Sequence, residues 1–359
     1  MAVEVSVSSA GPEKPTLVSR PSVINEQQAK ALAELKELCE KDKVYWPASE
    51  IEGHPAEGHN DDRNLLRFLV ARSYDPQAAY KQYSASAAWR RKVALVQTYD
   101  NTEIQMFEHS ELTGLIKQPQ WTGRRDRMGT PVMVYVLSEI RPEDLFQIAK
   151  EDPELSNIFL PAEYVTNFTQ RLCNRVQNNG IIINKSVSIV DFSNVGLRKF
   201  WNLRSLLQTA SSMATAHYPE TVERIFVVGA PYFFPTVWNI VTRWFDPATT
   251  KKVFVLSASE ATKKLTEFIA PENLPKRFGG LLDWTFPMRP VPDAETKKLI
   301  GSLAEEWIEG PIRYLSKPEG DFLVAVGSQD GQLRRETLAR IPQDSSTLKG
   351  QPSEPAPTT

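Results

Sequence analysis

The stretch RIFVVGAPYFFPTVWNIVTRWFDPATTKKVFVL (residues 224–256) decides the fold. It begins with a short apolar, β-branched run at 224–230 and ends with a second one at 251–256. Both runs are typical of buried strands bounded by charge or by glycine and proline. Between them a helical period extends over residues 235–245. Strand, helix and strand in this order predict parallel neighbours in one sheet, with the helix packed on a face of that sheet.

The helix at 235–245 is unusually apolar on one side. Its polar residues form a narrow strip that carries a single charge, Arg243. The broad apolar face consists of Val237, Trp238, Ile240, Val241, Trp244 and Phe245. A face with two tryptophans must cover something apolar: the protein core, a bilayer, or a ligand held inside the protein. Taken alone the pattern favours an ordinary core helix, and the rest of the chain bears on the choice.

The same alternation extends over the middle of the chain. PVMVYVL (131–137) and SVSIVDF (186–192) are strand-like, and helical stretches lie at roughly 154–178 and 198–216. We therefore predict an α/β domain over residues 126–285, built on a mixed, largely parallel sheet with helices packed on it.

Helices precede this domain, with no strand expected until about Met128. Asn25, Asp61 and Asp75 each stand where a helix N-cap is expected, and Pro76 suits a first helical position. These signals predict an all-helical N-terminal lobe over residues 23–125.

The remaining segments are less informative. Residues 286–342 form a C-terminal extension with a helix near 293–308 and a candidate hairpin, and they suggest no function. Residues 1–22 and 343–359 are rich in Ser, Pro and other polar residues, a composition that predicts disorder.

Composition excludes several classes of protein. The 359 residues carry a net charge of −2, so no overall basic field argues for nucleic acid. Cys39 and Cys173 are the only cysteines and form no CxxC motif, which suits a reducing compartment and argues against a cysteine zinc site. There is no signal-peptide pattern and no apolar run near the ~18 residues of a spanning helix. We expect a soluble, cytoplasmic monomer without metal or cofactor that meets a membrane only from outside.

The familiar catalytic motifs are missing. The sequence contains no GxSxG elbow, no GxxxxGK[ST] loop, no GxGxxG after a strand and no HExxH. His217 ends a predicted helix, where a structural role is the simplest interpretation. A hydrolase that uses Ser186 or Ser188 with His217 stays open as an alternative, although no motif supports it. We therefore expect no enzymatic activity.

A family resemblance gives the chain a function. The block DDRNLLRFLVARSYDPQAAYKQYSASAAWRRK (61–92) resembles the helical N-terminal region of the CRAL-TRIO lipid-binding family. Downstream, SVSIVDFSNVGL, AHYPETVERIFVVGAPYFFPTVW, FDPATTKKVFVL and PENLPKRFGG resemble the family's lipid-binding domain in order and spacing. The resemblance covers residues 28–285, and the subgroup most resembled is the fungal phosphatidylinositol/phosphatidylcholine transfer proteins. It implies a deep apolar pocket for one lipid and makes the helix at 235–245 a mobile gate over the pocket mouth.

The resemblance also implies headgroup ligands. Tyr164, Ser186 and Ser188 match phosphatidylcholine recognition, because a phenol and two hydroxyls suit phosphate oxygens. The two serines could instead simply solvate a strand edge. Gly279 matches a family glycine needed for a tight turn beside the gate, which is a backbone role.

Arg72, Glu220 and Lys252 match inositol-phosphate recognition. The two cations can neutralise a phosphate, and Glu220 can accept hydrogen bonds from inositol hydroxyls or orient a base. Arg72 could instead cap its helix, and Lys252 could be a solvated edge residue. The sequence departs from the family pattern where further basic residues are expected, at Ser73 and Thr221.

Met133 is a further departure, because the transfer proteins tend to place a tyrosine there. We nevertheless expect a lipid-binding and transfer protein that encloses one phospholipid, phosphatidylinositol or also phosphatidylcholine, visits membrane surfaces and presents lipid to lipid kinases. Two alternatives stay open. The chain could carry or sense another hydrophobic ligand, such as a sterol, an isoprenoid or haem. It could also be a lipid-gated regulatory adaptor whose C-terminal extension binds a partner.

Overall fold

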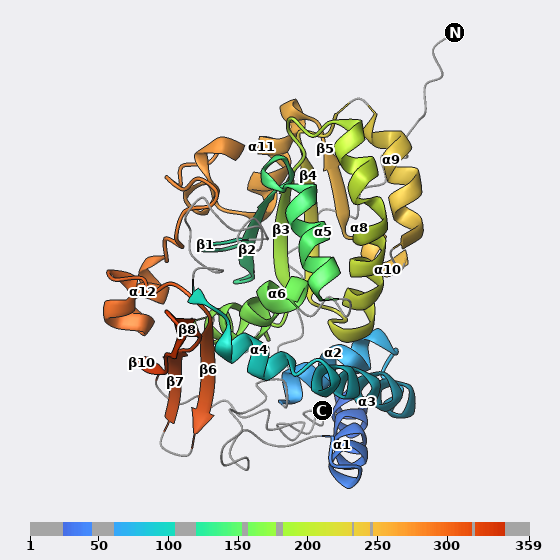
Figure 1. Ribbon diagram of the computed structural model, residues 1–359, viewed down its shortest axis with the longest axis vertical. Coiled ribbons are helices and arrows are strands. Elements are labelled where there is room, and N and C mark those ends of the chain that lie inside the picture. The colour runs from blue at the N-terminus through green and yellow to red at the C-terminus, as the bar shows by residue number, and fades with distance from the viewer. Residues whose placement is uncertain are drawn as a thin grey trace, which may run out of the picture.

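A computed structural model of the chain places a helical lobe next to an α/β domain, with a small second sheet beside both (Figure 1). It describes residues 24–44, 61–104, 120–152, 157–176, 182–231, 233–244, 247–317 and 320–341. The disorder predicted for 1–22 and 343–359 lies outside the described residues.

Three helices form the N-terminal lobe, and each starts where the sequence predicts. They are α1 (Glu26–Lys41), α2 (Asp62–Ala71) and α3 (Pro76–Lys92). Asn25 caps α1 in a reciprocal capping box with Gln28, Asp61 accepts a hydrogen bond from the backbone of α2, and Asp75 does so for α3. One hydrophobic cluster, drawn from all three helices, holds the lobe together. A short helix, α4 (Leu95–Asn101), then leads toward the α/β domain.

The larger sheet has five strands in the order β1-β2-β3-β4-β5. Their bounds are β1 Gln120–Arg125, β2 Pro131–Val136, β3 Ser186–Asp191, β4 Val222–Val228 and β5 Val253–Leu256. Strands β2 to β5 are parallel, and β1 pairs antiparallel with β2. The predicted mixed, largely parallel sheet is confirmed.

The expectation of no strand before Met128 is wrong, because β1 lies within the span assigned to the helical lobe. Its sequence, QWTGRR, has neither an apolar run nor clean alternation. Gly123 adopts φ +85°, and a Cβ there would lie 2.4 Å from the backbone of Val291. A close backbone neighbour, and not hydrophobic patterning, therefore determines the composition of this edge strand.

Helices connect the parallel strands on one side of the sheet. The elements between β2 and β3 are η2 (Leu137–Glu139), α5 (Pro142–Glu151), η3 (Asn157–Phe159), α6 (Leu160–Tyr164), the π-helical turn η4 (Val165–Thr169) and α7 (Gln170–Val176). Helix α8 (Leu197–His217) joins β3 to β4; α9 (Phe234–Val241), η5 (Thr242–Trp244) and α10 (Pro247–Thr250) join β4 to β5. Sequential parallel strands with right-handed crossovers place all these connections on the same face. Figure 1 shows α5 and α8 in front of the strands, with α9 beside α8.

The opposite face of the sheet is solidly packed. Strand residues such as Val134, Ile189 and Phe226 meet Leu265 and Phe268 of α11 (Ala258–Phe268) in one buried cluster. Short turns η6 (Pro271–Asn273) and η7 (Lys276–Phe278) follow and complete this layer. The sheet therefore has a rigid base on the α11 side.

A buried carboxylate fastens the lobe to the α/β domain. Both oxygens of Glu163, which is fully buried on α6, accept hydrogen bonds from Arg90 of α3, at 2.7 and 2.8 Å. The Tyr218 hydroxyl and the Asn167 amide also donate to Glu163. Next to this hub, the His217 ring stacks on Trp89 with 4.1 Å between ring centroids.

The C-terminal extension is part of the core. It comprises α12 (Ala294–Ile300), η8 (Gly301–Ala304), β6 (Ile312–Lys317), β7 (Gly320–Ala325), β8 (Ser328–Gln329), β9 (Gln332–Leu333) and β10 (Glu336–Ile341). β7 and β10 pair antiparallel, as the candidate hairpin requires, while β6 was not predicted. Leu315 and Val324 pack with Trp89 and Leu160, and Trp307 packs with Trp121. The extension therefore joins the lobe and the α/β domain in shared hydrophobic clusters.

Replacing Glu163 by Gln should destabilise the fold strongly. The change leaves the buried Arg90 guanidinium without its counter-charge, which typically costs about 3–5 kcal/mol. The change in free energy of unfolding is measured by urea denaturation. Asp62→Asn is the control, since its pair with Lys36 leaves both side chains more than a third exposed and should matter little. Equal losses in the two variants would show that Glu163 is not a central fastening point.

The His217 ring should make stability depend on pH. Burial, followed by the charge of Arg90, lowers the pKa of His217 to about 4, whereas an unfolded histidine titrates near ~6.5. The unfolded chain therefore binds a proton that the folded chain refuses, so stability falls as the pH drops from about 6.5 to about 4, by up to ~3 kcal/mol. The free energy of unfolding, measured by urea denaturation at several pH values in this range, should depend less on pH for His217→Phe than for the parent protein. An equal pH dependence in the two proteins would contradict the assignment.

Candidate lipid-binding site

The sheet face beneath α8 and α9 is apolar but incompletely packed. Strand register aligns Ser188, Ile225 and Val253 in one row on this face. These side chains are only half-buried, even though β3 and β4 are central strands. Val255, in the next row, is 41% exposed. Residues of the same strands on the α11 face are buried. An apolar face that lies under helices and still reaches solvent is suited to an apolar ligand.

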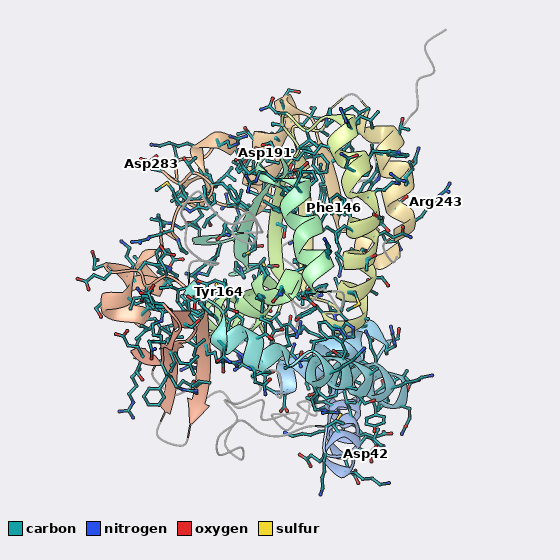
Figure 2. The ribbon with its side chains drawn as sticks, viewed as in Figure 1. Asp42, Phe146, Tyr164, Asp191, Arg243 and Asp283 are labelled. Atoms are coloured by element: carbon teal, nitrogen blue, oxygen red, sulfur yellow. The ribbon has the colours of Figure 1, made fainter. Side chains whose placement is uncertain are left out.

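The helix predicted as a gate lies over this face with the expected sidedness. Val237 is 1% exposed, while Asn239 and Arg243 are exposed; Figure 2 shows Arg243 pointing outward at the edge of the molecule. The Phe234 ring packs edge-on against Phe192, 4.9 Å between centroids, and also lies beside Trp238.

Ile240 is half-buried, which is consistent with the expected apolar face. The side chains of Val241 and Trp244, and the whole of Phe245, lie outside the described residues. The arrangement of the described residues is that of a closed helix held by aromatic contacts near its start.

A compact ionic cluster lies at the amino edge of the parallel strands. Glu220 Oε2 accepts from Lys252 Nζ and from Lys185 Nζ, each at 3.0 Å. Burial alone would raise the pKa of Glu220, but the two ammonium groups outweigh it and hold the pKa below its ordinary value. Each ammonium can donate three hydrogen bonds, so the cluster keeps capacity for an anionic oxygen. Glu220 itself adopts φ +54°, a conformation costly for a non-glycine residue and therefore notable at a site.

Lys185 was missed in the sequence, although a signal for it was present. It directly precedes β3, just as Lys252 directly precedes β5, and Glu220 stands two residues before β4. Parallel strands bring such positions to the same edge of a sheet. A search for charged residues immediately before each predicted strand would have found the third member.

Arg72 lies at the C-terminal end of α2. It forms the C-cap of α2, is exposed, and its guanidinium donates to the carbonyl of Ala71 at 3.0 Å. The structure therefore joins Glu220 and Lys252, two of the three residues expected to bind inositol phosphate, and shows Arg72 in the helix-end role that was the open alternative.

The expected phosphatidylcholine ligands occupy different environments. Ser188 is half-buried on the apolar face described above. Ser186 is buried, and its hydroxyl donates to the Thr221 carbonyl at 3.3 Å. Tyr164 packs edge-on against Phe168, and burial raises the pKa of its phenol. Tyr164 belongs to the same cluster as Met133, the strand neighbour of Ser188, so these residues share one region.

Comparison with known proteins agrees with this geometry. The family model of the CRAL/TRIO domain matches residues 117–280, and that of the CRAL/TRIO N-terminal domain matches residues 31–85. A Sec14 cytosolic factor of Schizosaccharomyces pombe is 30% identical over 221 residues, which span 61% of this chain and 74% of that protein.

The chain belongs to the CRAL/TRIO family.

Other CRAL/TRIO relatives are similar over comparable lengths. A SEC14 cytosolic factor of Candida glabrata is 27% identical over 266 residues, covering 74% of this chain and 82% of the relative. The phosphatidylinositol/phosphatidylcholine transfer protein SFH7 of Arabidopsis thaliana is 31% identical over 225 residues, covering 62% and 40%. The predicted family is confirmed.

A solved structure supports the CRAL/TRIO fold. The crystal structure of Sfh5 superposes with a TM-score of 0.53 at 15% identity, covering 79% of this chain and 98% of that one. Within the described part of the chain, no helix has the length and apolar character needed to cross a membrane.

The CRAL/TRIO glycine at position 279 has the expected backbone role. Gly279 adopts φ +86°, and a Cβ there would lie 2.2 Å from Thr262 Oγ1 of α11. That this turn lies beside the gate stays a prediction. Arg277, next to the turn, donates to Asp191, and the neighbouring Phe192 packs against Phe234 of α9. The glycine closes the turn that follows η7 against α11.

Proposed function

We propose that this chain encloses one phospholipid between the sheet and the helices α8 and α9, and exchanges it between membranes without chemical change. The observation that carries the proposal is the incompletely packed apolar sheet face with the Lys185–Glu220–Lys252 cluster at its edge. Acyl chains would lie along the apolar face, and a phosphorylated headgroup would reach the ammonium groups. Membership of the CRAL/TRIO family and similarity to the phosphatidylinositol/phosphatidylcholine transfer protein SFH7 support the same class of ligand.

The energetics of a lipid require such an enclosure. Two acyl chains of ~16 carbons carry about 25 kcal/mol of gross transfer free energy, at ~0.8 kcal/mol per CH₂. Spontaneous exit into water is therefore negligible, and a carrier must offer an equally dry interior.

The same physics determines where α9 opens. Swinging it away in water would expose on the order of 600 Å² of aromatic and aliphatic surface, or roughly 15 kcal/mol at ~25 cal/mol per Å². Against a bilayer the penalty nearly vanishes. The helix then stays closed in solution and opens at a membrane surface, which couples exchange to docking.

Phosphatidylinositol is the favoured cargo, because two ammonium groups and a carboxylate can bind both phosphate oxygens and ring hydroxyls. Lipid delivered in this way would be available to lipid kinases at the membrane.

A second class of cargo, a sterol, an isoprenoid or haem, is favoured by one observation: the Ser186 hydroxyl already donates to Thr221, and Met133 offers no polar group nearby. Mass spectrometry of lipid that co-purifies with the full chain separates the two.

Lys252→Ala should reduce phosphatidylinositol transfer several-fold while changing phosphatidylcholine transfer little, because only the inositol headgroup needs the cluster. Vesicle-to-vesicle transfer of each labelled lipid measures the ratio. Lys264→Ala is the matched control, since Lys264 lies on α11 and pairs with Glu267 on the far side of the sheet. Equal losses for the two lipids would show that the ionic cluster does not select the headgroup.

Trp238 should report gate opening. Adding phospholipid vesicles to the protein should change the tryptophan emission, and Trp238→Phe should lose most of that change because the ring leaves its aromatic contacts for lipid. Trp307→Phe, in the buried cluster of the C-terminal extension, should keep it. If Trp238→Phe responds to vesicles as strongly as the parent protein, α9 does not move at the membrane.

A further inference from the structure

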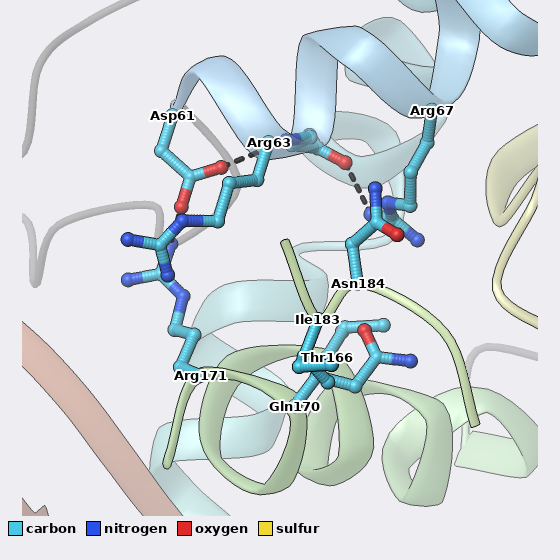
Figure 3. Close-up of a pocket in the computed structure, with 9 residues that line it drawn as sticks. Asp61, Arg63, Arg67, Thr166, Gln170, Arg171, Ile183 and Asn184 are labelled. Atoms are coloured by element: carbon cyan, nitrogen blue, oxygen red, sulfur yellow. Dashed lines mark hydrogen bonds and ion pairs between the residues drawn. The ribbon is translucent and has the colours of Figure 1, made fainter. Parts of the chain in front are cut away.

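A second basic site lies between the helical lobe and the α/β domain, apart from the lipid headgroup cluster. Helix α2 forms one wall, and the π-helical turn with the start of α7 forms the other (Figure 3). The chain just before β3 closes one side through Ile183 and Asn184. The cavity has a volume of about 20 Å³, and part of it opens to solvent. We call it the seam pocket.

Arg67 is the buried centre of the seam pocket. Its side chain is only 4% exposed, and Nη2 donates to the Asn64 amide oxygen. The other terminal nitrogen, Nη1, is buried and makes no hydrogen bond to any residue that the structure describes. Burial lowers the pKa of Arg67 to about 10, so the guanidinium is charged at neutral pH. A buried cation with an unused donor is costly unless an acceptor lies beside it.

Two carboxylates, Asp61 and Glu163, act electrostatically on Arg67, but each is hydrogen-bonded to another arginine, Arg171 and Arg90 respectively. Arg63 and Arg171 also line the seam pocket, so three guanidinium groups face one carboxylate, that of Asp61. Asp61 is already committed: it accepts from Arg171 Nη2 at 2.9 Å and from the Asn64 backbone N–H at 2.8 Å. Figure 3 shows Asp61, Arg63 and Arg171 on one side of the pocket and Arg67 with Asn184 on the other.

The neutral groups suit an oxyanion as well. Gln170 and Asn184 line the pocket and can supply amide donors. The hydroxyl of Thr166, which also lines it, already donates to the Ala162 carbonyl at 2.8 Å, and Ile183 is the one aliphatic residue of the lining. Arginine side chains approaching from opposite walls match a tetrahedral anion with several acceptor oxygens. Acyl chains would have no apolar surface to occupy here.

The π-helical turn explains how two of these residues come to line the pocket. η4 carries Thr166, and α7 begins directly with Gln170. A π turn widens the helix locally and is often found at functional sites. The Gln170 amide also reaches the Thr221 carbonyl at 3.5 Å, directly after Glu220, and Asn184 directly precedes Lys185. The seam pocket and the headgroup cluster are therefore neighbours with separate donors.

We propose that the seam pocket binds one phosphate-class anion, with Arg67 as its buried anchor and Arg63 and Arg171 completing the cradle. The bound anion supplies the charge that the seam lacks and fastens α2 of the lobe to α7 of the α/β domain. The anion is either free phosphate or the phosphomonoester of a lipid headgroup that reaches the protein surface. This site goes beyond the proposed lipid transfer and does not depend on it.

The test uses the full chain and inorganic phosphate. Phosphate added at constant ionic strength should raise the melting temperature of the parent protein relative to chloride, and titration calorimetry should give saturable binding to one site. Arg67→Met keeps the aliphatic stem but removes the donors, and should abolish binding. Arg63→Gln, which changes a half-buried residue, should weaken binding at least tenfold and decides the matter if Arg67→Met does not fold.

Two control variants separate this site from cations elsewhere in the chain. Arg72→Gln removes an exposed cation at the end of the same helix, and Lys264→Ala removes one from α11; both should bind phosphate as the parent does. No saturable binding to the parent, or equal binding by the parent and Arg63→Gln, overturns the proposal. Because calorimetry needs no lipid, failure here would leave the proposed lipid transfer untouched, and failure of transfer would leave this site untouched.

A second experiment, on vesicle binding, identifies the source of the anion. Binding to phosphatidylcholine vesicles is compared with and without phosphatidylinositol 4-phosphate, for the parent and for Arg63→Gln. If the headgroup phosphate is the occupant, the variant loses the added affinity and inorganic phosphate competes with the vesicles. If free phosphate is the occupant, the variant binds the two kinds of vesicle as the parent does while its calorimetric affinity for phosphate is still reduced.

Discussion

The buried Glu163 carboxylate is the constraint on which the rest of the structure depends. It accepts hydrogen bonds from Arg90 on α3, from Asn167 on the π turn, and from Tyr218 at the end of α8. Three segments distant in the sequence are thereby fixed around one ion. A charge removed from water in this way is tolerable only when its partners are complete. Because Tyr218 is held here, Glu220 is positioned two residues later at the edge of the sheet.

The contrast between the two faces of the sheet determines what the domain can do. On the α11 side, aromatic rings such as Phe226, Phe254 and Phe268 lie within 5.1 to 5.8 Å of one another, so the sheet cannot deform there. On the side of α8 and α9, central-strand side chains still reach solvent. The rigid layer on the α11 side thus supports a sheet face, on the side of α8 and α9, that can adapt to a ligand. A ligand that enters the adaptable side need not repack the core, which lowers the free-energy cost of loading and release.

Much of the fold was predictable because local signals and tertiary packing agree. The caps at Asn25, Asp61 and Asp75 predicted three helix starts, and apolar β-branched runs predicted β2 to β5. β1 was not predicted, because its sequence reflects one close backbone contact at Gly123 and shows no apolar periodicity. α5, α11 and β6 were also missed, although the capping box of Ser257 with Glu260 marks the start of α11 in the sequence.

The candidate site was predictable in part for a similar reason. The apolar side of α9 and the pairing of Glu220 with Lys252 follow from spacing and from the family pattern. Lys185 joins them only through the alignment of strand starts. The position of Arg72 depends on how α2 ends, and that of Ser186 on a carbonyl from another loop, so neither can be inferred from residue type alone.

The late arrival of the C-terminal sheet in the chain has a consequence for synthesis. Tyr99 of α4 donates to the Ile312 carbonyl at 2.9 Å, and the cluster around Trp89 and Leu160 is closed only by Leu315 and Val324. The contacts that Tyr99 and Trp89 make with this sheet span more than two hundred residues, so they form slowly and cannot form while the ribosome still holds these strands. A nascent chain carries its lobe and its α/β half with an uncovered apolar side until β6 and β7 have left the ribosome. During that interval the chain exposes the most apolar surface to which chaperones can bind.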